Sequence, residues 1–260
     1  MWDTTLEFRG MDMSVLEIGI ISLVGLVLGA MGAVIGSTLL VLVPMLSFLG
    51  LPIQTAIGTA KISVIGREII PAVYFHTKKL VKLGLAIPFS ISALITSWYG
   101  SVVAISLDAN ILEKIVGIFM CIISAIILIN PKIGLEEKET KMTFMHMAIS
   151  IVLGALVGFY IGIFGGGGNV FIIFGFILIF GHTFLQATAT SKLPNLLITA
   201  ISIPVFIFND FVNWEIAIPL TLSTTAGSYF GARLAFKKGN KFIRALFVGL
   251  VLVFAVKYLI

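Results

Sequence analysis

Long apolar runs separated by short polar breaks dominate the sequence. Six runs approach the length of a membrane-spanning helix, and they cover residues 53–75, 83–105, 111–129, 184–208, 214–236 and 242–260. A helix of about 20 apolar residues crosses the hydrocarbon core of a bilayer, which is about 30 Å thick. The pattern therefore predicts an all-α polytopic membrane protein.

Two further runs, 14–49 and 144–180, are too long for one span and are interrupted by glycines. The interruptions lie at Gly29, Gly32 and Gly36 in the first run, and at Gly162 and residues 165–168 in the second. The limb after the second interruption, 169–181, would extend about 20 Å as a helix, which is too short to cross the membrane. We expect each run to form a glycine-broken helical hairpin, with a re-entrant form preferred over two short spans.

The two halves of the chain repeat one another. A single fixed offset matches positions from Gly50 to the C-terminus, and it pairs Thr59 with Thr190 and Lys61 with Lys192. An intramembrane lysine that recurs at a fixed offset is hard to obtain by chance matching of apolar residues. The sequence therefore divides into an N-terminal tail, a first membrane repeat, a polar linker and a second membrane repeat, over residues 1–13, 14–130, 131–143 and 144–260.

Loop charge indicates how the repeats are oriented. The basic loops are 78–82 and 237–241, and their repeat equivalents, 209–213 and 106–110, contain no Lys or Arg. Because Lys and Arg in short loops mark the cytoplasmic side, equivalent loops should lie on opposite sides of the membrane. This predicts two inverted-topology repeats, each a glycine-broken hairpin plus three transmembrane helices, with loops 78–82, 131–141 and 237–241 in the cytoplasm. The alternative is a parallel duplication of four spans each.

Composition excludes several classes of protein. Hydrophobic residues make up 59% of the chain and charged residues only 11%, against about 25% in ordinary soluble domains. This excludes a soluble enzyme and a disordered chain, and the single cysteine, Cys121, excludes an intramolecular disulfide. The net charge of +5 comes mostly from loops and does not indicate a nucleic-acid partner. The three histidines show no metal-ligand spacing and no nucleotide-binding or catalytic motif is present, so we expect no cofactor, no metal and no enzymatic activity.

The glycine breaks are candidate anion sites. Unwound backbone at membrane depth is tolerated only beside protein or a water-filled cavity, and the helix that restarts after the break presents free N–H groups and a positive dipole end. The candidates are Gly36, Ser37, Thr38, Gly165, Gly166, Gly167, Gly168 and Asn169. The alternative is that the breaks serve packing and flexibility. Close helix packing is the simpler explanation for Gly25, Gly29, Gly154 and Gly158, which are spaced by four.

Lys61 and Lys192 are the most informative polar residues. Each is the ninth residue of its span, where a charged side chain is costly and normally faces the bundle interior. Thr188, Lys192 and Asn195 share one helix face, and further candidates near the two lysines are Thr59, Thr190 and Ser191. We expect the lysines to bind substrate or gate its pathway. The alternative is that they tether helices to backbone carbonyls.

Arg67 and Glu68 have no charged equivalents in the second half, where Ile198 and Thr199 occupy the matching positions. One interpretation is a structural ion pair near the inner membrane interface. The other is a gating or coupling role, in which the carboxylate responds to protons. The sequence leaves both open.

Together these motifs resemble the TauE/SafE family of sulfite exporters. The resemblance rests on a glycine-broken first helix, a GTAK element at residues 58–61, a second GxxGGGG hairpin at 162–168 and an ATxTSK-like element at 187–192. It implies a plasma-membrane carrier of small anions such as sulfite or organosulfur compounds, with the hairpins and lysine elements around the pathway. The chain departs from the family pattern at residues 36–38, where Gly-Ser-Thr replaces the usual glycine triplet.

The sequence thus predicts a secondary carrier that moves a small anion, sulfite or an organosulfur or sulfonate compound, by alternating access. The anion would bind near the midplane between the two hairpins, with Lys61 and Lys192 neutralising it. Its partners would be the anion, a coupling proton or ion, and the lipid bilayer. Two alternatives stay open, namely an anion channel and a membrane assembly subunit that transports nothing.

Overall fold

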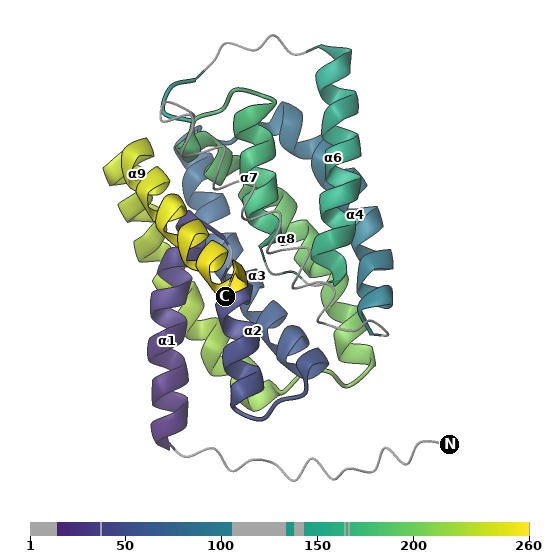
Figure 1. Cartoon of the computed structure of the whole chain (residues 1–260), viewed down its shortest axis with the longest axis vertical. Coiled ribbons are helices and arrows are strands. Elements are labelled where there is room, and N and C mark those ends of the chain that lie inside the picture. The colour runs from purple at the N-terminus through teal and green to yellow at the C-terminus, as the bar shows by residue number, and fades with distance from the viewer. Residues whose placement is uncertain are drawn as a thin grey trace.

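The computed structural model describes residues 15–36, 38–105, 134–137, 143–163, 165 and 167–259, and every regular element in these ranges is an α-helix (Figure 1). The helices are α1 (Val15–Val34), α2 (Leu39–Phe48), α3 (Ile53–Thr77), α4 (Leu83–Ala104), α6 (Phe144–Ile163), α7 (Gly168–Leu178), α8 (Phe184–Phe208) and α9 (Trp214–Leu259). The all-α prediction is confirmed for these residues. The tail 1–13, Ser37, Cys121, Gly166 and the expected span 111–129 lie outside them.

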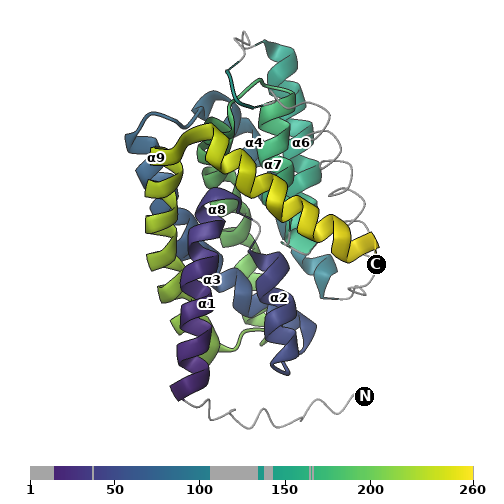
Figure 2. The ribbon, with the colours of Figure 1, turned by 60° about the vertical axis from the view of Figure 1, so that its left-hand side comes forward.

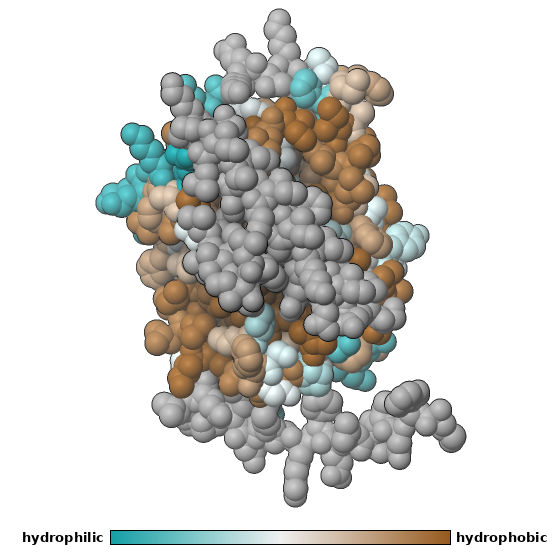
Figure 3. Space-filling view, viewed as in Figure 1, coloured by the Kyte–Doolittle hydropathy of each residue, from teal (hydrophilic) through white to brown (hydrophobic). Residues whose placement is uncertain are grey.

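The described helices carry the apolar surface of a multi-pass membrane protein. Helices α4, α6 and α8 are long and apolar enough to cross a membrane. Large hydrophobic side chains face outward along the bundle, including Leu23, Leu156 and Leu222, each about two-thirds exposed, and hydrophobic residues cover much of the visible surface in Figure 3. Helix α3 is less hydropathic because it contains three charged residues, all of them buried.

The long helix α9 is bent into two arms. Gly239 has a φ of 71° and a ψ of −164°, which is not helical, so the first arm ends before it and the second begins after it. Figure 2 shows the second arm turning across the bundle from the end of the first. The two segments that the sequence predicted, 214–236 and 242–260, correspond to these arms.

Each glycine break separates a long helix from a short one. Gly36 lies between α1 and α2 with a φ of 79°, and Gly165 and Gly167 lie between α6 and α7, both with a φ of 77°. Helices α2 and α7 have 10 and 11 residues, which corresponds to about 15–17 Å and is too short to cross a hydrocarbon core of about 30 Å. The short second limbs are therefore confirmed, while a re-entrant position in the bilayer stays a prediction.

Backbone conformations recur in the two halves at the same sequence separation as that between Lys61 and Lys192. Positive φ angles occur in pairs at Gly36 and Gly167, at Gly50 and Gly181, and at Lys79 and Asp210. The last pair is the most telling, because residues other than glycine seldom adopt this conformation. Both loops also close with the same type of hydrogen bond, from Leu80 to Phe75 and from Phe211 to Phe206. These pairs support the predicted duplication of the chain.

The two halves interlock through their first helices. Helix α1 packs along the first arm of α9, and α6 packs along α4, so the first helix of each half lies against the fourth helix of the other. A Cβ on Gly29 would collide with the backbone of Thr224, and a Cβ on Gly158 with that of Ala93. Thr224 and Ala93 are themselves equivalent positions of the repeat. The packing interpretation of these glycines is confirmed.

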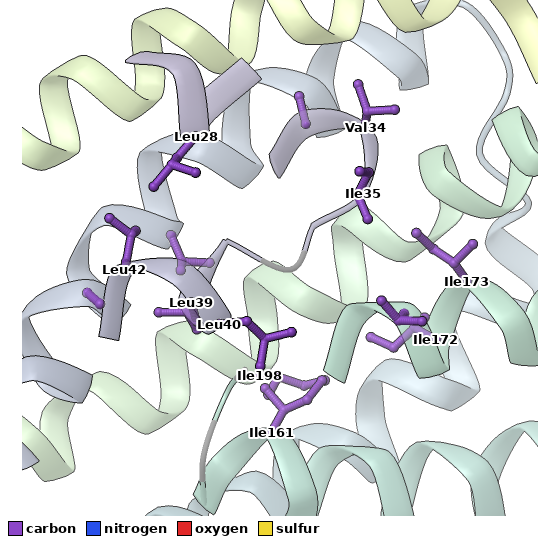
Figure 4. Packing of buried hydrophobic residues seen from close by; sticks show 14 of the residues in the cluster. Leu28, Val34, Ile35, Leu39, Leu40, Leu42, Ile161, Ile172, Ile173 and Ile198 are labelled. Atoms are coloured by element: carbon purple, nitrogen blue, oxygen red, sulfur yellow. The ribbon is translucent and has the colours of Figure 1, made fainter. Parts of the chain in front are cut away.

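The two first helices run in opposite directions. In Figure 1, α1 begins at the lower edge of the bundle, whereas α6 begins at the upper edge. Helices α3 and α8 pack against each other between them. Buried aliphatic residues of the hairpins and α8 fill the centre, where Figure 4 shows Leu39, Ile161 and Ile198 close together. The hairpins therefore meet in the core of the molecule.

Candidate functional site

Each intramembrane lysine reaches the glycine-broken hairpin of the other half. The Nζ of Lys61, on α3, donates hydrogen bonds to the carbonyls of Gly162 at 2.7 Å and Ile161 at 3.3 Å. The Nζ of Lys192, on α8, donates to the carbonyl of Gly32 at 3.0 Å. These carbonyls lie in the last turns of α6 and α1, where C=O groups lack helical partners and carry the negative end of the dipole. The tether interpretation is confirmed, and a role in substrate binding stays a prediction.

The surroundings of the two lysines differ. Lys61 is only 1% exposed, and its other neighbours are the hydroxyl of Ser202, 3.4 Å away, and the ring of Phe206, whose centroid is 4.7 Å from Nζ. Among the described residues it forms no ion pair with a carboxylate. Lys192 is fully buried and lies 3.2 Å from Oε2 of Glu68. Lys61 therefore lies among uncharged groups, whereas Lys192 lies beside a carboxylate.

Glu68 links four polar side chains into one buried cluster. Its Oε1 accepts a hydrogen bond from Nη2 of Arg67 at 2.7 Å and another from Nδ2 of Asn195 at 3.0 Å, while its Oε2 faces Lys192. The side chains of Arg67, Glu68 and Lys192 are at most 1% exposed. The predicted ion pair between Arg67 and Glu68 is confirmed. Sequence reasoning had no means of joining it to Lys192 and Asn195, which lie on a different helix.

Two buried donors of the Arg67 side chain have no hydrogen-bond partner among the described residues. Its Nε and Nη1, and the hydroxyl of Thr38, make no hydrogen bond within the described part of the chain. A Cβ on Gly32 would lie 2.9 Å from both Nη1 of Arg67 and Cγ2 of Thr38, so the three residues meet in one place. Leaving such groups unsatisfied costs about 1–3 kcal/mol each, and more when they are charged. An oxyanion is the type of ligand that would satisfy them.

The second hairpin reaches the first through polar contacts. Nδ2 of Asn169 donates to the carbonyl of Ile35 at 3.0 Å, and the hydroxyl of Thr188 donates to that of Val34 at 3.2 Å. A Cβ on Gly36 would collide with the Asn169 side chain, so this position requires glycine for space as well as for its positive φ. Gly165 lies against Lys61 and Leu39, and Gly168 begins α7. The structure therefore brings Gly36 and Asn169 of the two hairpins together and places Gly165 against Lys61.

Three predicted candidates bond elsewhere. The hydroxyl of Thr59 accepts from the backbone N–H of Asn213 at 2.9 Å, and that of Thr190 accepts from the N–H of Lys82 at 3.1 Å. Ser191 donates to the Thr188 carbonyl of its own helix at 2.9 Å. Thr59 and Thr190 thus anchor the loops that precede α9 and α4, and their bonds form an equivalent pair in the two halves.

A comparison with protein families identifies the chain. The model of the sulfite exporter TauE/SafE family matches residues 21–258. The chain belongs to this family. It is 28% identical to the probable membrane transporter protein YfcA of Escherichia coli K12 over 251 residues, which cover 95% of this chain and 91% of that protein. It is 25% identical to a probable membrane transporter protein of Haemophilus influenzae over 238 residues, covering 92% of each. No solved structure matches it.

Family membership confirms the resemblance inferred from the glycine and lysine motifs. The match extends over both hairpins, α3 and α8, so the buried cluster lies within the part of the chain that defines a TauE/SafE protein. Relatives named as membrane transporters agree with the expectation of transport in place of catalysis. The substrate comes under the proposal below.

A second polar cluster, which the sequence did not predict, joins the linker of this TauE/SafE protein to its helices. Asn240 bridges it, donating from Nδ2 to the carbonyl of Leu135 at 3.0 Å and accepting from the N–H of Leu185 at 2.9 Å. Glu137 pairs with Lys82 at 2.7 Å and with Gln186 at 2.6 Å, and these two hydrogen bonds hold the pKa of Glu137 below its usual range. The loops around residues 82, 137 and 240 therefore lie at the same end of the molecule.

His182 lies in the turn between α7 and α8, close to this cluster. It is 5% exposed and packs between the rings of Phe176 and Phe180, at centroid distances of 5.7 and 6.5 Å. Burial, with a smaller effect of the positive charge on Lys82, lowers the pKa of His182 to about 4. The imidazole is therefore neutral near pH 7.

Proposed function

We propose that this protein is a secondary carrier of a small oxyanion, either sulfite or an organosulfur or sulfonate compound, in the plasma membrane. The observation that carries the proposal is the buried cluster between the two hairpins. Arg67 and Lys192 carry two positive charges there, and Glu68, the one buried acid in the described residues, carries one negative charge. Lys61 is a further buried cation, bonded to the second hairpin. The excess of positive charge in the cluster favours the entry of an anion.

The unsatisfied donors of the cluster suit an oxyanion. The Nε and Nη1 of Arg67 are buried donors of a charged guanidinium without a partner in the described residues, and guanidinium groups bind oxyanions strongly. Thr38 lies next to them at the N-terminal end of α2, the end of a helix that favours an anion. A tetrahedral or pyramidal anion at this point would have donors on several sides. Lys61 and Lys192 would add charge from the two halves.

The arrangement of the halves supports alternating access. Helices α1 and α6 run in opposite directions, and the lysine tethers recur between the halves, as inverted-topology repeats require. The loops around 82, 137 and 240 lie at one end, which supports the placement of 78–82, 131–141 and 237–241 together in the cytoplasm. Transport would move one hairpin relative to α3 and α8, with the lysine–carbonyl bonds broken on one side at a time.

Burial of the cluster favours a carrier over a channel. An open pore exposes its selectivity residues to water, whereas here the charged side chains of the cluster are at most 1% exposed. Solute counterflow in vesicles separates these functions, because a carrier is accelerated by substrate on the opposite side and an open pore is not. A membrane assembly subunit would give no flux at all.

The test uses the purified protein in lipid vesicles with radiolabelled sulfite, sulfate, thiosulfate and methanesulfonate. We expect counterflow of at least one sulfur anion, and its loss in the variants Lys61→Met and Lys192→Met. Lys238→Met is the matched control, because it removes an exposed lysine outside the cluster. Unchanged transport in both cluster variants would refute the lysine site, and the absence of counterflow for the whole panel would refute the carrier.

A further inference from the structure

The two lysine sites differ by one carboxylate, and this difference has a functional consequence. At the Lys192 site, Glu68 already pairs with the two cations that an anion would bind. At the Lys61 site, the equivalent ligands are backbone carbonyls, a hydroxyl and an aromatic ring. Because Thr199 stands at the repeat position of Glu68, the carboxylate was not required by the duplicated fold.

All the elements packed around Glu68 present either cations or uncharged groups to it. Arg67 comes from α3 itself, and Lys192 and Asn195 come from α8. Helix α1 contributes the Gly32 carbonyl, which binds Lys192, and α2 contributes Thr38 beside Arg67. Helix α9 faces this stretch of α3 with the uncharged side chains of Thr221, Thr224 and Thr225. No second carboxylate of the described chain shares the site.

Charge balance links anion binding at this site to a proton. If an anion bound to Arg67 and Lys192 while Glu68 stayed ionised, two negative groups would lie on the same two cations in a buried place. If Glu68 instead takes up one proton as a monovalent anion arrives, the net charge of the cluster does not change. Proton uptake by Glu68 therefore avoids moving an uncompensated charge through the low-dielectric interior.

We propose that Glu68 is the counter-anion of Lys192 and Arg67 in the empty carrier. When the substrate anion binds these two cations, it displaces Glu68, and Glu68 binds a proton. Each anion then crosses the membrane together with one proton. The proton bonds to a carboxylate oxygen of Glu68 on the side where the anion enters, and it leaves to solution on the other side as the carboxylate pairs with the cations again. This coupling rests on the carrier function proposed above.

The assay measures anion accumulation and proton movement together. Vesicles carrying the full-length protein enclose a pH-sensitive dye, their membrane potential is clamped at zero, and their interior is about one pH unit more alkaline than the outside. The probe is radiolabelled methanesulfonate, with thiosulfate as a second probe, because both stay fully ionised near neutral pH. One proton per monovalent anion corresponds to about tenfold accumulation of methanesulfonate and to acidification of the interior.

The variant Glu68→Gln keeps the size of the side chain and cannot be ionised. We expect it to lose both the accumulation of methanesulfonate and the proton movement, and size-exclusion chromatography checks that it is folded. Glu137→Gln is the matched control, because Glu137 is also paired with a lysine but is 44% exposed. It should accumulate methanesulfonate like the unaltered protein.

The outcomes separate the coupling from the carrier function. Counterflow without proton movement in the unaltered protein would overturn the role of Glu68 and leave the carrier in place. Proton-driven accumulation that persists in Glu68→Gln would do the same. If Glu68→Gln does not fold, the ratio of protons to anions in the unaltered protein decides, since a ratio of zero overturns the coupling. No counterflow of either probe in the unaltered protein would overturn both proposals.

Discussion

Replacing Lys192 by methionine should destabilise this protein far more than replacing Lys61. Methionine preserves most of the side-chain volume, so the comparison isolates the charge. Without Lys192, Oε2 of Glu68 loses its ion-pair partner and the carbonyl of Gly32 loses its hydrogen bond. Removing one partner of a buried ion pair costs about 3–5 kcal/mol, because the other charge is left without compensation.

The same change at Lys61 leaves no charge behind. The carbonyl of Gly162 keeps the hydroxyl of Ser101 as a donor, at 3.1 Å. The lost hydrogen bonds of a charged donor, about 1.5–3 kcal/mol, are offset by removal of a desolvated cation. We expect Lys61→Met to change the free energy of unfolding by no more than about 1 kcal/mol, within the range of ordinary substitutions.

The measurement is the apparent Tm of each purified variant in one detergent, followed by tryptophan fluorescence. A loss of about 3 kcal/mol lowers Tm by about 6–12 °C in a protein of this size. In a double-mutant cycle, Glu68→Gln combined with Lys192→Met should be less destabilising than the sum of the single changes by about 1 kcal/mol or more. Equal losses for Lys61→Met and Lys192→Met, or strict additivity in the cycle, would refute the assignment of Lys192 as the partner of Glu68.

Three further predictions concern packing, pH and the linker. Gly158→Ala should reduce the fraction of monodisperse protein in size-exclusion chromatography, because its methyl group would collide with the backbone of α4, while Gly19→Ala, where no atom lies within 4 Å, should not. His182 binds a proton near pH 6.5 in the unfolded chain but only near pH 4 in the folded chain, so the free energy of unfolding should fall by about 3 kcal/mol as the pH drops from 6.5 to 4. In a plot of Tm against pH, His182→Phe should abolish this part of the pH dependence. Glu137→Gln should alter Tm by the equivalent of less than about 1 kcal/mol, since its pair with Lys82 is 41–44% exposed, and a larger drop would mean that this pair holds the linker in place.

Much of the fold could be predicted because membrane-spanning helices require long apolar runs, which are easily recognised in a sequence. Apolar runs gave the positions of α3, α4 and α8 to within a few residues, and the glycines gave the places where α1 and α6 end. The fixed offset between the halves identified Lys61 and Lys192 as equivalents before any contact was known. Such patterns depend on short-range periodicity and on self-comparison, both of which are visible in one chain.

The contacts of the site could not be predicted in the same way. Helical periodicity places Lys192 and Asn195 on one face of α8, but it carries no information about which residue of α3 faces them. The pairing with Glu68 depends on how two distant helices pack. Thr59 and Thr190 illustrate the opposite error, since their nearness to the lysines in sequence suggested a shared site while their hydroxyls bond to loop backbones.

The exchange of lysine tethers between the halves also bears on how the protein is made. Lys61 finds its carbonyl partner 101 residues later in the chain, so α3 enters the membrane well before α6 has been synthesised. Until then its ammonium group has no partner within the nascent chain and must stay near water or within the insertion machinery. Neither half is therefore a self-sufficient folding unit, and assembly is completed only when the second hairpin joins the first.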